Sequence, residues 1–375
     1  MLIQFTVENF GSFKNPGSLS FVESRISEFK ESLLHSPSDA TGILPVMMLY
    51  GPNGGGKSTI LRALTFLGLS AVSSLEESPH FSGDKESKKK PSAFEIIFRI
   101  KDMEYNYQLK VSHKKVLEET LFYRNLSQSA YDVVFDRDSE GIYLDGPVKQ
   151  VDVAALEDNM TMLGFLHTQH ISTELDSAIG WLQNLHMKSC QQVTDEQLLD
   201  VLKVSEKKEQ LLTYMNQLGY SLKDITVVKG IPYLIYANGM KLSFSQEASG
   251  VSMILMMLSW YLSKADDGGI FIADDISGSL HPALLAQFIR LFTTQKATGT
   301  AQLIATSNDM PTMHNSFLRR DEIWLCSKSL DEGSSLYTLA EYIKENGEKV
   351  RKDEVYYKQY LEGRYDSVPG IQNLS

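Results

Sequence analysis

The stretch MMLYGPNGGGKSTILRAL, residues 47–64, decides the fold of this chain. It contains G-x-x-x-x-G-K-S from Gly51 to Ser58, directly after an apolar run and directly before a helical pattern. A strand, a glycine loop and a helix in this order form a loop that can wrap phosphate groups. The sequence therefore predicts a phosphate-binding loop between a buried strand over 43–50 and a helix from Ser58 to about Ala71.

The residue types in this loop fit a nucleotide with a magnesium ion. Glycines let backbone N–H groups converge on phosphates, and the helix start adds a positive dipole end. Lys57 can reach the β- and γ-phosphates, and the Ser58 hydroxyl can coordinate Mg2+. An ordinary glycine turn would not explain Lys-Ser directly after the last glycine. The predicted nucleotide-binding residues are Gly51, Pro52, Asn53, Gly54, Gly55, Gly56, Lys57, Ser58 and Thr59.

Length and composition are typical of a soluble globular protein. The chain has 375 residues, 42% apolar and 22% charged, which fits one elaborated α/β unit or two lobes that share a sheet. A net charge of −11 argues against a broad DNA-coating surface. The basic run KESKKK, 85–90, is more typical of a solvated loop, although a local nucleic-acid contact stays open.

The sequence also indicates a compartment. Only Cys190 and Cys326 are present, far apart and without metal-ligand spacing, which suits a reducing environment without disulfides or zinc. The apolar runs are too short to span a bilayer, and the first residues lack a basic leader pattern. We therefore expect a cytoplasmic protein without a membrane partner.

Periodicity places the remaining elements. Alternating patterns predict strands over 2–8, 19–22, 94–100, 105–111, 225–228 and 233–236. Apolar residues that recur every three or four positions predict helices between 151 and about 218. Further on we expect a helix over 250–262, a strand over 269–273, a helix over 282–292 and a strand over 302–306. The expected parts are a β-rich lobe (1–150), a helical subdomain (151–225) and a C-terminal lobe (226–375).

A second chemical element is GGIFIADD, from Gly268 to Asp275. A buried parallel strand would deliver its terminal acids to the carboxyl edge of the sheet, beside the phosphate loop. Two adjacent acids alone are also common in turns. Together with the phosphate loop they form a Walker B arrangement, in which Asp274 would hold the Mg2+ shell and Asp275 would orient the attacking water.

A third element is SFSQEASGVSMILMML, residues 243–258. Ser249, Gly250 and the first N–H groups of the following apolar helix can form an anion site. An ordinary helix N-cap is the alternative interpretation. Because the segment lies shortly before the Walker B strand, it resembles the signature motif of ABC-type ATPases. That motif contacts the γ-phosphate held by another subunit.

The order of motifs resembles the SMC/RecF/OLD-like ABC ATPases over nearly the whole chain. The motifs are VENFGSF (7–13), GPNGGGKST (51–59), EASG (247–250), ADDISGSLHP (273–282) and QLIATSND (302–309). The resemblance implies an α/β P-loop NTPase, namely an ABC-type head with a mixed β lobe, a central parallel sheet and a helical subdomain. It also implies ATP and Mg2+ as ligands, and head-to-tail dimers or larger homo-oligomers that close over two ATP molecules.

By this resemblance several residues acquire roles. Ser249 and Gly250 are the signature acting in trans, and Ser279-Leu280-His281-Pro282 contacts the opposite protomer. Asn308 stands where a switch histidine is usual.

The closing region is similar to a narrower group. DEIW (321–324), Lys328 and YLEGRYDSVPGI (360–371) resemble small ATPases of bacterial abortive-infection and anti-phage systems, such as Septu, retron-Septu and PARIS modules. This implies a switch or sensor that scaffolds or restrains a separate effector nuclease or toxin. The alternative is a RecF- or SMC-like DNA-repair ATPase that binds DNA directly, against which speak the acidic charge and the lack of a long heptad arm. A scaffold without turnover is a third option, and a transporter subunit is least favoured.

Two departures from the family pattern favour slow hydrolysis. Asp275 replaces the usual glutamate, so its carboxylate would lie about 1.5 Å further from the water, and a misplacement of about 1 Å can cost ~10²-fold in rate. Asn308 can donate a hydrogen bond to a γ-phosphate oxygen, but it cannot become cationic. Shifted loops could compensate for both changes.

Some assignments stay open by sequence alone. Gln108 and Gln169 are candidates for the Q-loop glutamine by residue type only. His167 and His170 have no acid or cysteine at ligand spacing, so we do not expect a metal there. Four arginines could serve as an arginine finger, and nothing selects among Arg124, Arg290, Arg319 and Arg320.

Overall fold

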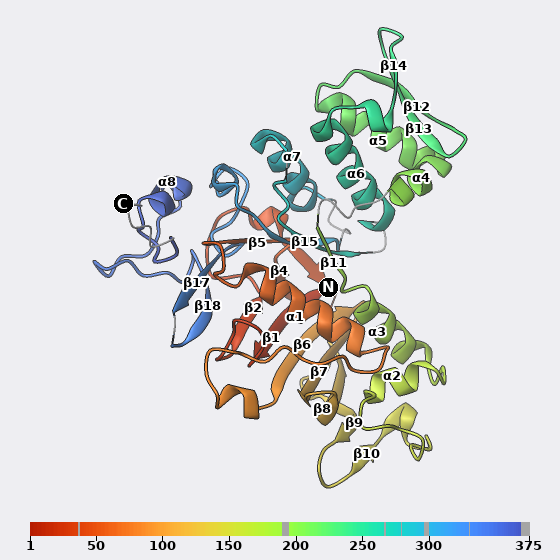
Figure 1. Ribbon diagram of the computed structural model, residues 1–375, viewed down its shortest axis with the longest axis vertical. Helices are drawn as coiled ribbons and strands as arrows, with labels where there is room; N and C mark the ends of the chain where they lie inside the picture. The colour runs from red at the N-terminus through yellow and green to blue at the C-terminus, as the bar shows by residue number, and fades with distance from the viewer. Residues whose placement is uncertain are drawn as a thin grey trace.

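A central six-stranded sheet lies between a larger antiparallel sheet on one side and a group of helices on the other (Figure 1). The computed structural model describes residues 1–36, 38–189, 195–265, 268–278, 280–295, 300–329 and 331–368. Helix α1 (Lys57–Ser70) contacts β1 (Leu2–Glu8) of the larger sheet and β15 (Ile270–Asp274) of the central sheet, so it packs between the two. This arrangement confirms the expected α/β class with a β lobe, a central sheet and a helical region.

The central sheet is parallel except at one edge, where β17 and β18 are antiparallel. In spatial order its strands are β11 (Met187–Ser189), β15, β16 (Gln302–Thr306), β5 (Val46–Tyr50), β17 (Ile323–Ser329) and β18 (Gly333–Thr338). Alternate side chains of β5 serve two cores: Met47 and Leu49 join the α1 core, whereas Met48 joins that of α6 (Ser249–Lys264) and α7 (Pro282–Thr293). Burial on both faces explains the continuous apolar run in this strand.

The expected strand over 43–50 is wrong in one respect, because the chain interrupts it at Pro45. β4 (Asp39–Ile43) pairs with β3 (Leu34–Ser36), and β5 begins only at Val46. Proline has no N–H to donate into a ladder. The apolar run is therefore divided between two sheets.

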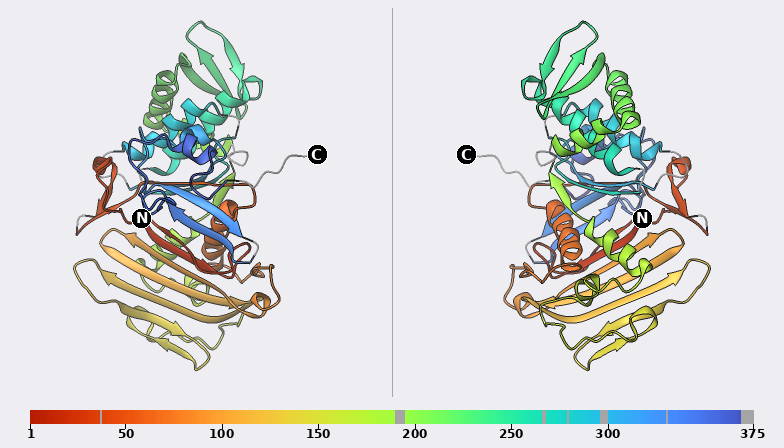
Figure 2. Two further views of the ribbon diagram at one scale, coloured as in Figure 1. Left: turned by 90° about the vertical axis from the view of Figure 1, so that its left-hand side faces the viewer. Right: turned by 90° about the vertical axis from the view of Figure 1, so that its right-hand side faces the viewer.

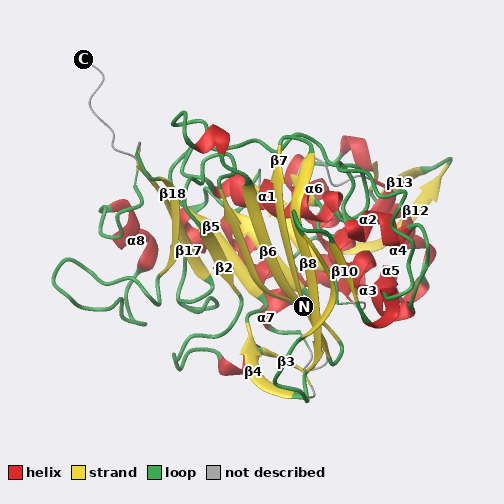
Figure 3. Ribbon diagram, turned by 90° about the horizontal axis from the view of Figure 1, so that it is seen from below, coloured by secondary structure: helices red, strands yellow, loops and turns green. Residues whose placement is uncertain are grey.

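The larger sheet is antiparallel and has one open face. In spatial order its strands are β10 (Ile142–Leu144), β9 (Asp132–Arg137), β8 (Lys115–Asn125), β7 (Met103–Ser112), β6 (Ser92–Ile100), β1 and β2 (Gly17–Ser20). The strand expected over 19–22 therefore lies two residues earlier. Phe98 and Tyr107 on the inner face join the α1 core, together with α2 (Met162–His167) and α3 (Thr173–Gln183). Seen from below, none of the described helices covers the outer face (Figure 3).

The helical part lies on the other side of the central sheet. α4 (Asp195–Lys203) and α5 (Ser205–Gln217) pack on α6. A three-stranded sheet of β12 (Leu222–Val228), β13 (Ile231–Tyr236) and β14 (Lys241–Ser243) projects beyond them (Figure 2). The expected helices between 151 and 218 are α2 to α5, but the expectation misses β11 among them. A three-residue strand is too short to show a period, and it forms because it pairs in parallel with β15.

The end of the described chain folds back over β17 and β18. α8 (Tyr356–Leu361) brings in the buried Tyr360, whose hydroxyl donates to the Ser367 carbonyl at 2.7 Å. The Ser367 hydroxyl in turn donates to the Cys326 carbonyl at 2.6 Å. Cys326 is a free, buried cysteine, whereas Cys190 and residues 369–371 of the closing motif lie outside the described residues.

Among the described residues, no helix combines the length and the apolar character needed to cross a bilayer.

Candidate functional site

The loop after β5 is pressed against the edge of the central sheet. Gly51 has φ +146°, and a Cβ there would lie 2.5 Å from the Cys326 carbonyl oxygen. Gly56 has φ +115°, and a Cβ there would lie 2.5 Å from the Ser334 hydroxyl. Both positions therefore require glycine for backbone conformation and for space.

Lys57 begins α1 and folds back over the loop. Its Nζ donates to the Gly51 carbonyl at 2.6 Å and to the Pro52 carbonyl at 3.1 Å. Burial lowers the pKa of the Lys57 ammonium, and the nearby Asp274 and Asp275 carboxylates oppose that shift. A phosphate group in the loop would offer this ammonium a stronger, anionic acceptor than a carbonyl.

Asp274, at the end of β15, connects the two strand ends to the loop helix. Its Oδ1 accepts from the Ser58 hydroxyl at 2.8 Å and from the Thr306 hydroxyl at 2.6 Å. Ser58 and Asp274 thus form a pair of hard oxygen groups at the start of α1, the donor chemistry that Mg2+ prefers.

Asp275 lies one residue beyond the strand and points to solvent. It has φ +50°, and its N–H donates to the Thr306 hydroxyl at 2.7 Å. Its Oδ1 accepts from the Ser277 hydroxyl at 2.8 Å, while the Asn308 amide nitrogen lies 3.5 Å away, at the long limit of a hydrogen bond. The position of the exposed Asp275 carboxylate is therefore fixed by the backbone hydrogen bond to Thr306 and by its contacts with Ser277 and Asn308.

These groups surround one hollow of about 360 Å³. It is lined by Pro52, Asn53, Gly54, Gly55, Gly56, Lys57, Ser58, Thr59, Arg62, Asp274, Asp275, Thr306 and Asn308. The structure thus brings together the glycine loop, both acids and Asn308 from three separate segments. A glycine cradle, a cation and a paired hydroxyl and carboxylate fit a nucleotide polyphosphate with Mg2+.

Ser249 and Gly250 do not line this hollow. They start α6, on the helical part of the molecule, and Ser249 is exposed. The N-cap is Ala248 without a side-chain hydrogen bond, so the interpretation of Ser249 as an ordinary N-cap is wrong. Glu247 secures the segment before the helix, because its carboxylate accepts from the Tyr236 hydroxyl at 2.5 Å and from the Ala248 N–H at 3.0 Å. The Val251 and Ser252 N–H groups donate to the Ala248 carbonyl at 2.9 and 3.0 Å, so the helix begins without a side-chain cap. The role of Ser249 and Gly250 in binding an anion stays a prediction.

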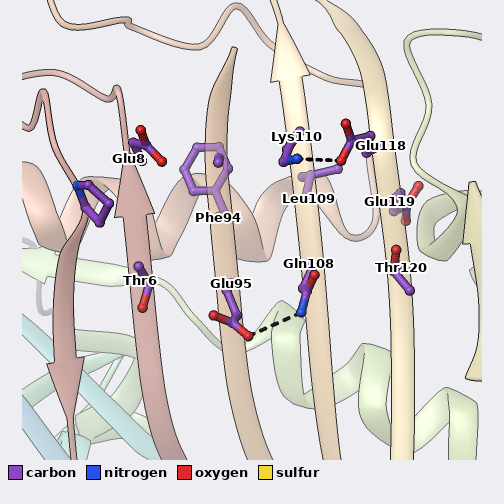
Figure 4. Close-up of a pocket in the computed structure, with 12 residues that line it drawn as sticks. Thr6, Glu8, Phe94, Glu95, Gln108, Leu109, Lys110, Glu118, Glu119 and Thr120 are labelled. Atoms are coloured by element: carbon purple, nitrogen blue, oxygen red, sulfur yellow. Dashed lines mark hydrogen bonds and ion pairs between the residues drawn. The ribbon is translucent and has the colours of Figure 1, made fainter. Parts of the chain in front are cut away.

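Neither Q-loop candidate reaches the hollow. Gln108 lies on β7, in a second hollow on the open face of the larger sheet, and donates to Glu95 at 3.3 Å (Figure 4). Gln169 is exposed after α2 and does not line the site. Strand β11, in contrast, ends beside the site, because its last residue Ser189 pairs with Asp274 of β15. The glutamines that follow in the sequence, Gln191 and Gln192, lie outside the described residues.

The four arginines considered from sequence are engaged elsewhere. Arg319 is fully buried on Asp321, Arg320 pairs with Glu28, Arg124 pairs with Glu104, and Arg290 lies over the Phe317 ring. Arg62, which the sequence reasoning missed, lines the hollow one turn along α1. Its guanidinium donates to the Ser58 carbonyl and the Thr59 hydroxyl, both at 3.3 Å. Its spacing of four residues from Ser58 is the signal that could have revealed it.

Three further sequence features have structural positions away from the hollow. His281 caps α7 by accepting from the Ala283 N–H at 3.2 Å, and Ser279 of the same motif lies outside the described residues. The opening motif anchors the basic run, because the Asn9 amide donates to the Ser87 and Lys90 carbonyls at 2.8 and 2.9 Å. The lysines of that run are exposed, as in a solvated loop.

Comparison with known proteins agrees with this geometry. A family model described as "AAA domain, putative AbiEii toxin, Type IV TA system" matches residues 46–310, which include the glycine loop, both acids and Asn308. No curated protein sequence matches the chain.

Solved structures share the fold. An SMC head domain from Thermotoga maritima has a TM-score of 0.50 and 11% identity, over 90% of this chain and 98% of that chain. An Smc head bound to the C-winged helix domain of ScpA has a TM-score of 0.47 and 13% identity, over 90% of this chain and 97% of that chain. An Smc head domain with an extended coiled coil, bound to the C-terminal domain of ScpA and derived from Pyrococcus furiosus, has a TM-score of 0.44 and 12% identity. The match covers 90% of this chain and 96% of that chain. The Thermotoga maritima match confirms the expected ABC-type P-loop fold, and the chain belongs to the AAA-domain family of the AbiEii kind.

Proposed function

We propose that this protein is an ATP-binding switch that closes as a head-to-tail dimer, with ATP between the two chains. The observation that supports the proposal is the separation of the loop hollow from the exposed start of α6. The hollow with Lys57 holds the loop and the acids, whereas the exposed start of α6 at Ser249 lies on the helical part and contributes nothing to the hollow of its own chain. A second copy can supply that helix start, and two-fold symmetry would then give two identical sites.

In this proposal the chain's own residues divide the work. Lys57 and the loop N–H groups bind and orient the polyphosphate, and Mg2+ held near Ser58 and Asp274 supplies charge neutralisation. Asp275 would orient and polarise the attacking water. Asn308, whose amide nitrogen lies 3.5 Å from Asp275 Oδ1, would hold the γ-phosphate by a neutral hydrogen bond. A short carboxylate and an uncharged switch residue support slow hydrolysis, so that the ATP-bound state persists.

We place this switch in bacterial anti-phage defence. The family description, with its AbiEii toxin and type IV toxin–antitoxin system, supports a defence role. The closing region, similar to that of Septu, retron-Septu and PARIS ATPases, narrows it to a subunit that scaffolds or restrains a separate nuclease or toxin. Cytoplasmic action and a homo-oligomeric form are parts of the same proposal. The alternative, a DNA-repair ATPase, predicts binding of DNA by the purified protein and stimulation of its ATPase.

Mixed dimers of two inactive variants test the composite site. Lys57→Ala should disable the loop of its own chain, and Ser249→Arg should place bulk where the partner's γ-phosphate must lie. Each variant alone is expected to be inactive. In a mixed dimer one site carries both defects, while the other combines an intact Lys57 with an intact Ser249. Exchange of subunits should therefore restore part of the ATPase activity or, where basal rates are too slow, the ATP-dependent dimer lifetime.

The exchange needs its own control. Two differently labelled samples of the parent protein should show subunit exchange under the same conditions, and Ser205→Arg, at an exposed serine that begins α5, should leave activity unchanged. If subunits exchange and neither activity nor dimer lifetime returns, the trans role of Ser249 is wrong. The protein would then bind ATP within one chain.

A further inference from the structure

A single hydroxyl group connects the two acids of the site. Thr306 is the last residue of β16 and only 2% exposed. Its Oγ1 donates to Asp274 Oδ1 at 2.6 Å and accepts from the Asp275 N–H at 2.7 Å. A hydroxyl can donate one proton, and the Thr306 hydroxyl donates it to the Asp274 carboxylate. A lone pair of the same oxygen accepts the backbone N–H of Asp275. Thr306 therefore fixes the side chain of one acid and the backbone of the other.

The bond to Asp274 gains importance when a metal is bound. In the described chain two side-chain hydroxyls donate to Asp274 Oδ1, those of Ser58 and Thr306. Under the proposed function the Ser58 oxygen would coordinate the Mg2+ ion, which would weaken its hydrogen bond to Asp274. The hydroxyl of Thr306 would then remain to hold the Asp274 carboxylate in its position at the hollow.

The bond to Asp275 addresses a backbone that needs support. Asp275 has φ +50°, in the left-handed region that non-glycine residues seldom occupy. A conformation of this kind persists only where the surroundings fix it. The Ile276 N–H also donates to the Thr306 carbonyl at 2.9 Å, so Thr306 contacts the turn through both side chain and backbone.

We propose that Thr306 is a positioning residue, which aims Asp274 at the magnesium ion and holds the turn that presents Asp275. This inference rests on the proposed ATP site and adds a residue to which neither the sequence motifs nor the family description assigns a role. It concerns the metal dependence of nucleotide binding, and it does not depend on the defence role or on the dimer.

Binding of ATP with and without Mg2+ tests this inference. Thr306→Val keeps the shape of the side chain and removes the hydroxyl. Loss of a group that orients a metal ligand typically costs about 10- to 100-fold in metal affinity. We therefore expect the Mg2+ concentration that gives half-maximal ATP binding to rise about tenfold or more in Thr306→Val. ATP affinity in EDTA should equal that of the parent, because no metal is involved.

Two variants separate positioning from packing. Thr306→Ser keeps the hydroxyl and should restore the parental Mg2+ dependence. Thr312→Val removes a threonine hydroxyl of similar burial, 1% exposed, that donates to the Asp309 carbonyl at 2.6 Å outside the hollow, and it should leave the Mg2+ dependence unchanged. If Thr306→Val does not fold, Thr306→Cys, with a weak thiol donor, should show a smaller shift in the same direction.

The outcomes are distinct. A parental Mg2+ dependence in a folded Thr306→Val or Thr306→Cys overturns the positioning role and leaves the ATP site intact. The same holds if Thr306→Ser is as defective as Thr306→Val, since the methyl group would then matter more than the hydroxyl. If the parent itself binds no ATP with Mg2+, the proposed function fails, and the inference fails with it.

Discussion

Lys57→Ala is expected to lose most of its ATP affinity while keeping its fold. Hydrogen bonds to charged groups contribute ~1.5–3 kcal/mol each, so removing the ammonium should weaken ATP binding about 10- to 100-fold. Among the described residues, Lys57 donates to two loop carbonyls, at 2.6 and 3.1 Å, and these can turn to water at the open hollow. Titration calorimetry with ATP and Mg2+ measures the loss directly.

A matched variant separates charge in the hollow from charge elsewhere. Lys344 is also partly buried and forms an ion pair with Glu354 at 2.6 Å, away from the hollow. Lys344→Ala should lose some stability and keep its ATP affinity. Thermal unfolding supplies a second readout, because a ligand that binds only the folded state raises its stability. One fixed ATP concentration should raise the melting temperature of the parent and of Lys344→Ala equally, and that of Lys57→Ala by less. Equal ATP affinity in all three proteins would remove the assignment of the glycine loop.

The elements that carry motifs were the most predictable from sequence. The strand expected over 302–306 is β16 to the residue, and the helix expected over 282–292 is α7 with one residue more. Both are continuous apolar or periodic segments bounded by clear turn residues, so local pattern and tertiary burial agree. The fold class followed from the same source, because a parallel sheet with covered faces requires such runs.

Elements without a strong local pattern were missed. β11 has three residues and depends on β15 for its hydrogen bonds, so the sequence alone could not show it. β17 and β18 form the edge beside β5. β17 runs from four buried residues to exposed ones, and β18 does not alternate strictly, so neither strand shows a clear period of two. The interruption at Pro45 was visible in the sequence, but a strong apolar run outweighed it.

The placement of the candidate site could be predicted in part. Parallel strands bring their carboxyl ends to one edge, which is why Asp274 and Asn308 lie near the loop. Thr306 and Arg62 escaped notice because a hydroxyl at a strand end and an arginine on a helix have many common uses. Their positions matter only once the segments are assembled. The functions of these residues, and of Ser249 in a partner chain, stay predictions.

Asp275→Ala is expected to abolish ATP turnover while ATP still binds. The carboxylate is exposed at the hollow, and loss of a positioned general base typically costs ~10²–10⁴-fold in rate. ATP affinity should persist, because the loop, Lys57 and Asp274 remain in place. Asp275→Asn keeps the shape and the tolerance for a left-handed backbone, and it removes the charge. It should therefore be as inactive as Asp275→Ala, measured as phosphate release in single-turnover conditions.

Asp275→Glu tests whether a longer carboxylate side chain speeds hydrolysis or whether it strains the backbone turn at this position. A longer side chain brings the carboxylate nearer to the position of the water, so we expect the turnover rate to be kept or raised. Left-handed backbone favours aspartate and asparagine over longer residues, so the turn at φ +50° should become less stable. Asp366 is a matched control, because it has φ +53° and lies outside the hollow, with its carboxylate accepting from Tyr342 at 2.7 Å. Asp366→Glu should then lower the melting temperature without changing turnover.

The two rates decide where the base lies. If hydrolysis in Asp275→Ala equals that of the parent, Asp275 is not the base, and another group must orient the water. If Asp275→Ala is inactive and Asp275→Glu is too, with a melting temperature that falls as in Asp366→Glu, the turn has lost its geometry and the reach argument fails. If Asp275→Glu hydrolyses ATP faster than the parent, the aspartate at this strained turn limits the rate of ATP hydrolysis. Slow turnover would then follow from the choice of residue at one position, as a switch that must stay closed requires.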